Sequence, residues 1–130
     1  MKEPEWVFKE TVLGFHEQSL NDHGGSSGIR DEGLLDSALG KPQNLFAYGN
    51  PNLFDLAASY AFGIVKNHPF IDGNKRTGFV AAVLMLEANG YHFTADETDA
   101  AVRTLALAAG DMSETAYAAW LESNCEHHEA

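Results

Sequence analysis

One ten-residue segment gathers the side chains of this sequence that could do chemistry: residues 68–77, His-Pro-Phe-Ile-Asp-Gly-Asn-Lys-Arg-Thr. His68 offers an imidazole, which can accept a proton at neutral pH. Asp72 offers a carboxylate, an oxygen ligand of the kind that magnesium binds. A candidate general base and a candidate metal ligand therefore lie four residues apart.

The second half of this segment is suited to binding an anion. Gly73 lets the backbone approach a ligand closely, and Asn74, Lys75 and Arg76 add hydrogen-bond donors and positive charge. A helix that begins here points its first backbone N–H groups outward, at the positive end of its dipole. Hydrogen bonds to a charged group contribute about 1.5–3 kcal/mol each, so several can hold a phosphate. We therefore expect residues 73–76 to form a phosphate cradle.

A base, a metal ligand and an anion cradle are the parts that phosphoryl or nucleotidyl transfer to a hydroxyl requires. Each part alone is weak evidence for an active site, because a lone His at a helix end usually has a structural role. Lys75 and Arg76 alone are compatible with a solvated helix start. The combination favours an active site, in which we expect His68 and Arg76 to be catalytic.

Helical patterns flank the segment on both sides. Apolar residues recur on one helical face over residues 53–68, and Pro69 ends that pattern. A second pattern begins at about residue 74 and is apolar all round over 79–86, which predicts a helix buried on every side. The chemical segment is therefore expected to be a short turn between two helices.

Four further helices are predicted from the same periodicity. The first covers residues 5–20, with Pro4 in its first turn, and the second covers 31–40, with Asp31 as its cap. A third covers 94–110 and is capped by Thr94 or Asp96. The last begins at Asp111 or Ser113 and is expected to fray from Glu122. Prolines predict a non-helical segment over 41–52. Only 91–94, or part of 41–52, could pair locally as a strand. The sequence predicts an all-α fold of six helices in a single domain over residues 1–130.

Composition narrows the function classes. With 130 residues, 45% hydrophobic, the chain suits one domain with a sizeable core. A formal net charge of -11 repels phosphate backbones and anionic lipids, so neither nucleic acid nor a membrane is expected as a partner. A single cysteine excludes an internal disulfide, and the N-terminal residues lack the features of a secretory signal. We expect a cytoplasmic protein.

The chemical segment resembles the motif of a known family. Residues 68–76, HPFIDGNKR, are similar to the Fic motif, His-Pro-Phe-x-Asp/Glu-Gly-Asn-x-Arg, and the Asn-Lys-Arg-Thr ending is closer to the death-on-curing (Doc) branch. Residues 28–35 and 45–49 also resemble segments that precede the motif in that branch. The resemblance covers most of the chain and implies the compact all-α Fic fold.

The resemblance also implies a role for each motif residue. His68 is the general base, Asp72 binds Mg²⁺, and the turn at Gly73 and Asn74 holds the phosphates of ATP. Phe46 and Tyr48 have two interpretations, as ordinary packing residues or as part of a flap that docks the substrate protein.

Two positions depart from the Fic enzymes that transfer AMP. Those enzymes usually carry Gly between the motif Asn and Arg and a second Arg three residues later, where this chain has Lys75 and Phe79. Doc toxins share the alteration, and the resemblance implies that they bind the nucleotide reversed, transfer its terminal phosphate to elongation factor Tu, and are restrained by an antitoxin. We therefore expect a phosphotransferase of a toxin–antitoxin pair. AMP transfer, and a non-catalytic interaction module on the Fic scaffold, remain as alternatives.

Overall fold

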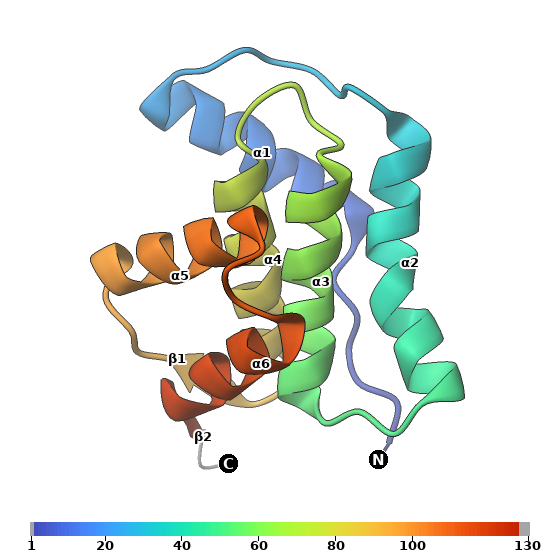
Figure 1. The fold of residues 1–130 in the computed structure, drawn as a ribbon. Coiled ribbons are helices and arrows are strands. Elements are labelled where there is room, and N and C mark those ends of the chain that lie inside the picture. Colours follow the sequence, from blue (N-terminus) through green and yellow to red (C-terminus); the bar gives the residue numbers. More distant parts are fainter. Residues whose placement is uncertain (1, 128–130) are drawn as a thin grey trace.

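The computed structural model describes residues 2–127, which form six α-helices and one two-stranded antiparallel sheet (Figure 1). In chain order the elements are α1 (Lys9–His23), α2 (Glu32–Tyr48), α3 (Leu53–Asn67), α4 (Asn74–Ala88), β1 (Tyr91–Phe93), α5 (Glu97–Ala109), α6 (Glu114–Ser123) and β2 (Cys125–His127). The expected all-α fold of six helices is confirmed. No helix among the described residues is long and apolar enough to cross a membrane.

Helix α3 forms the centre of the molecule and lies between α2 and α4 (Figure 1). Glycines allow the close approach on both sides: a Cβ at Gly63 would lie 3.2 Å from Cα of Ala38 in α2, and one at Gly78 of α4 would lie 2.9 Å from Cγ1 of Val65. The apolar pattern of residues 79–86 in α4 predicts a helix buried on every side. That expectation is wrong, because α3 is the helix covered on nearly every side and α4 leaves Phe79 half-buried beside a cavity described below.

The first helix begins four residues later than predicted. Residues 2–8 are not helical, so Pro4 does not lie in a helical turn. The extended chain is instead tied to the core, since Glu5 N–H donates to Oδ1 of Asn89 at 2.8 Å and Val7 N–H donates to the hydroxyl of Tyr60 at 3.2 Å. These contacts with residues distant in sequence outweigh the local helical pattern.

The predicted break over residues 41–52 is also wrong, because α2 continues through Pro42 to Tyr48. A proline inside a helix costs about 3 kcal/mol, since it removes a hydrogen bond and its ring crowds a carbonyl one turn earlier. Continuing the helix keeps Leu45 and Phe46 packed against the core, and burying such side chains contributes about 1.5–3 kcal/mol each. The helix ends only at Gly49, whose N–H donates to the carbonyl of Leu45 at 2.9 Å.

The C-terminal third agrees with the predicted caps but not with the predicted fraying. Asp96 caps α5 and Ser113 caps α6, each accepting a backbone N–H with its side chain. Residues 125–127 do not fray, because they pair with 91–93 as a short antiparallel sheet. The suggested strand over 91–94 is therefore present as 91–93, but its partner is the distant segment 125–127 and not a local one.

Candidate active site

The chemical segment forms the turn between α3 and α4, as the sequence predicts (Figure 1). His68 is the C-cap residue of α3 and has φ 52° and ψ 53°, the left-handed conformation. Among the residues that the structure describes, it is the one non-glycine with positive φ. Its side chain is exposed, so the imidazole is accessible to a substrate.

The first turn of α4 has the geometry that an anion cradle requires. The N-cap is Gly73 at φ 81°, a conformation that favours glycine, and no side chain of residues 2–127 caps this helix. The backbone N–H groups of residues 74–76 therefore lack intrahelical partners. They lie at the positive end of the α4 dipole, so an anion can bind there.

The side chain of Asn74 is buried inside the turn and is not open to solvent. Its side chain is only 4% exposed, and its Oδ1 accepts the N–H of Phe70 at 3.0 Å while its Nδ2 donates to the carbonyl of Phe70 at 2.9 Å. The amide is thus committed to holding the turn closed around a buried aromatic ring. What Asn74 can offer a phosphate is its backbone N–H.

Replacing Asn74 by alanine is expected to destabilise the protein by about 2 kcal/mol or more, because two buried backbone groups of Phe70 lose their partners. The free energy of unfolding is measured in urea for Asn74→Ala and for the control Lys75→Ala, which changes an exposed neighbour on the same turn. Equal stability of the two variants would show that the amide does not hold the turn.

Asp72 presents its carboxylate at the surface next to the cradle. Oδ1 accepts the N–H of Gly73 at 3.0 Å, and Oδ2 accepts the N–H of Ser26 at 3.3 Å. Within residues 2–127 no group of three or more His, Cys, Asp or Glu side chains gathers to hold a metal alone. Mg²⁺ suits such a place, because it is commonly held by one or two carboxylates together with substrate phosphates and water. Asp72 therefore fits a metal that arrives with a nucleotide.

His16 of α1 supports the turn from inside the molecule, which sequence reasoning missed. Its ring is 5% exposed, stacks on Phe70 with centroids 3.8 Å apart, and donates from Nε2 to the carbonyl of Asp72 at 2.7 Å. A signal was available, since Val12, His16 and Leu20 are spaced by four residues and so share one face of a helix. That spacing indicates that this face of the helix is buried, but it does not identify the residues that the face contacts.

Residues 24–31, which connect α1 to α2, also hold the turn, and Figure 1 shows this connection passing over it. Ile29 forms a β-bridge with Phe70, and Ile71 N–H donates to the carbonyl of Gly28 at 3.1 Å. The connection from α1 to α2 is therefore part of the site.

Phe46 and Tyr48 are not brought together with the turn. The N-terminal end of α2 adjoins the turn, whereas these residues lie at its other end, and a helix of this length measures about 25 Å. Phe46 packs edge-on against Trp6, with centroids 5.7 Å apart, while Tyr48 is 89% exposed. The packing interpretation therefore fits Phe46, and neither residue lies where a flap over His68 would.

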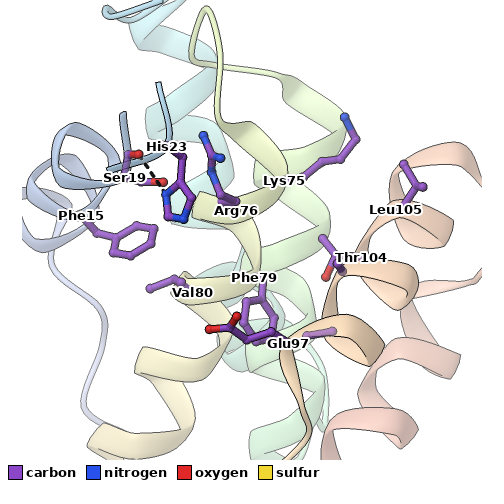
Figure 2. A pocket seen from close by; sticks show the side chains of 12 residues that line it. Phe15, Ser19, His23, Lys75, Arg76, Phe79, Val80, Glu97, Thr104 and Leu105 are labelled. Atoms are coloured by element: carbon purple, nitrogen blue, oxygen red, sulfur yellow. Dashed lines mark hydrogen bonds between the residues drawn. The ribbon is translucent and has the colours of Figure 1, made fainter. Parts of the chain in front are cut away.

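A cavity of about 440 Å³ opens beside the cradle, between α1, α4 and α5 (Figure 2). Lys75 and Arg76 extend from the first turn of α4 at one end, and Phe79 lines the wall one turn further on. The wall is mostly apolar, with Phe15 from α1 and Leu105 from α5. Among the described side chains, Nε of Arg76 is buried without a hydrogen-bond partner. The cavity can take an apolar ring with a negatively charged group toward its cationic end.

The fold and the site together define an all-helical domain whose His-to-Arg turn combines an exposed imidazole, an exposed carboxylate and an open helix N-terminus. The chain belongs to the Fic/DOC family, whose sequence model matches residues 6–86. One similar protein is "Protein kinase doc" of Escherichia phage P1, 31% identical over 108 residues, or 82% of this chain and 85% of the phage protein. Another is "Toxin Doc" of Mycolicibacterium smegmatis, 43% identical over 76 residues, or 56% of this chain and 58% of that protein.

Proposed function

We propose that this protein is a Doc-type toxin that transfers the terminal phosphate of ATP to a hydroxyl of elongation factor Tu and thereby inhibits translation. The observation that carries the proposal is the single turn that contains the exposed His68, the exposed Asp72 and the open start of α4. The similarity to a protein named as a kinase and to one named as a toxin supports the choice of reaction.

In the proposed reaction His68 acts as the general base. The acceptor oxygen forms a bond to the terminal phosphorus, the bond from that phosphorus to the ADP oxygen breaks, and the acceptor proton passes to the imidazole. Mg²⁺, when bound with the nucleotide, offsets negative charge on the phosphate oxygens. Asp72 would hold that ion, because it is the exposed carboxylate next to the cradle.

The cradle and the cavity suggest how the nucleotide lies. The N–H groups of residues 74–76 and the side chains of Lys75 and Arg76 bring positive charge to the start of α4, where the transferred phosphate would sit. One turn further, Phe79 presents an aromatic ring instead of a guanidinium. We therefore place the terminal phosphate in the cradle and the nucleoside in the apolar cavity, which is opposite to the orientation that AMP transfer requires.

The identity of the transferred group tests this orientation. Purified protein, Mg²⁺ and elongation factor Tu are incubated with ATP labelled either at the γ- or at the α-phosphate. We expect label on the factor from γ-labelled ATP alone, a mass increase of one phosphate, and ADP as the second product, because charge is stabilised where the transferred group sits. Label from α-labelled ATP with release of pyrophosphate would show AMP transfer instead.

The same experiment separates the enzyme from a non-catalytic Fic-scaffold module. A module that only binds partners has no physical need for a base, a metal ligand and a cradle in one turn. If neither label reaches elongation factor Tu or any protein of a cell lysate, the module becomes the better interpretation.

Two surfaces suit protein partners. Ile71, three residues after His68 in the turn, is 50% exposed, and its N–H binds the segment that carries the exposed Ile29. We assign these apolar side chains to contact with the protein substrate. On α5, Val102 and Leu105 are 59% and 56% exposed, and Leu105 borders the cavity. We assign the second surface to a cognate antitoxin in the cytoplasm, which would restrain the enzyme by covering the cavity.

Neither direct nucleic-acid binding nor membrane binding is part of the proposal, because the net charge of -11 repels phosphate backbones and anionic lipids.

A further inference from the structure

We propose that Arg30 is a positioning residue that fixes the backbone of His68 and thereby aims the catalytic imidazole. The inference rests on the proposed function for the role of His68 as general base. Arg30 lies outside the motif, in the connection between α1 and α2, and neither touches the cradle nor lines the cavity.

The conformation of His68 needs support from outside the turn. At φ 52° and ψ 53° the residue is in the left-handed region, which Cβ sterics disfavour for every residue except glycine. Its imidazole is exposed, and within residues 2–127 no hydrogen bond to a protein group orients it. The backbone at residue 68 therefore fixes the direction of the Cα–Cβ bond, and with it the region that the imidazole can reach by rotation of its side chain.

Arg30 binds the backbone on both sides of that position. Its Nε donates to the carbonyl of His68 at 2.7 Å, its Nη2 donates to the carbonyl of Asn67 at 2.9 Å, and its own N–H donates to the carbonyl of Pro69 at 2.7 Å. One residue thus holds three consecutive carbonyls, two of which, those of Asn67 and His68, a helix C-terminus leaves without intrahelical partners. Its charge also lies at the negative end of the α3 dipole.

The chemistry of the contact requires arginine. The planar guanidinium reaches two neighbouring carbonyls with two fixed donors, whereas a lysine ammonium is a single point charge on a flexible stem. Lysine at position 30 would keep the charge at the end of α3 but not the two-point hold on residues 67 and 68. Arg30→Lys therefore separates the geometry of the contact from its electrostatics.

The two halves of the turn are held by different groups. The side chain of Arg30 holds the carbonyls of residues 67 and 68, whereas the side chains of His16 and Asn74 hold residues 70–72 and the start of α4. Backbone groups of residues 28–31 also bind residues 69–71, and a substitution of the Arg30 side chain leaves these backbone groups in the chain. Loss of the Arg30 contacts should therefore displace the base and leave the phosphate cradle in place. This separation predicts a lower kcat with an unchanged KM for ATP.

The test compares Arg30→Lys and Arg30→Met with the matched control Arg103→Lys, because Arg103 lies on α5 in an exposed ion pair with Asp99. The measurements are kcat and KM for phosphate transfer, calorimetric ATP binding, and the NMR Cα and Cβ shifts of His68, which report its φ and ψ. We expect kcat to fall about 10- to 100-fold in Arg30→Lys and further in Arg30→Met, since small displacements of a reacting group cost that much. The His68 shifts should move, while ATP binding and the control stay as in the wild type.

Three outcomes overturn the inference: kcat equal to that of the Arg103→Lys control, unchanged His68 shifts in Arg30→Met, or a loss of ATP binding that parallels the loss of kcat, which would indicate a general structural role. If the wild-type protein transfers phosphate to no protein, the proposed function fails separately. The His68 shifts then still decide whether Arg30 fixes the backbone.

Discussion

Replacement of His68 by alanine is expected to lower the rate of phosphate transfer by about 10²–10⁴-fold, the usual contribution of a general base. ATP should still bind, because the phosphate site that we propose is the open start of α4 and does not include the imidazole. The fold should persist as well, since the side chain is exposed and takes part in no packing of the core. The transfer rate is measured as the initial rate with γ-labelled ATP, ATP binding by calorimetry, and the persistence of the fold by a thermal melt.

His92→Ala provides the matched control for this prediction. His92 lies on β1, at the opposite end of the molecule from the turn (Figure 1). Its loss should leave transfer unchanged. Full transfer by a folded His68→Ala protein would rule out the imidazole as the base, whereas a parallel loss in both variants would point to damage of the fold.

Replacement of Asp72 by asparagine is expected to lower transfer by about 10²-fold or more and to weaken the dependence on Mg²⁺, because a bound metal contributes several kcal/mol of charge stabilisation in such reactions. Asparagine keeps an Oδ1 that can accept the N–H of Gly73, at the place where the carboxylate now accepts it at 3.0 Å. The substitution therefore removes mainly the charge. The measurement is the initial rate across a Mg²⁺ titration.

Asp72→Ala and Asp111→Asn complete this comparison. Alanine removes the ligand atoms as well as the charge, so it should be at least as damaging as asparagine. Asp111 follows α5 and lies outside the turn, so its substitution should not alter the Mg²⁺ dependence. Identical Mg²⁺ curves for the wild type and both Asp72 variants would mean that Asp72 only shapes the turn.

The sequence determined the features that depend on neighbouring residues. The apolar periodicity of 53–67 and the position of Pro69 placed the end of α3, and Gly73 placed the start of α4. The turn between them was therefore predictable, together with the exposed His68 and Asp72 that it presents. Asp96 and Ser113 were likewise readable as caps, because a cap contacts the backbone only three residues away.

Only the tertiary structure decided what each side chain of the turn contacts. Asn74 has the donors of a phosphate ligand, yet its amide closes the turn on Phe70 because both are buried. His16 and Arg30 support the turn from 56 and 38 residues away, and Pro42 stays helical because α2 packs along α3. Such contacts depend on which helix faces meet in the core. Periodicity predicts that a face is buried, but the partner across it is fixed only when the helices pack.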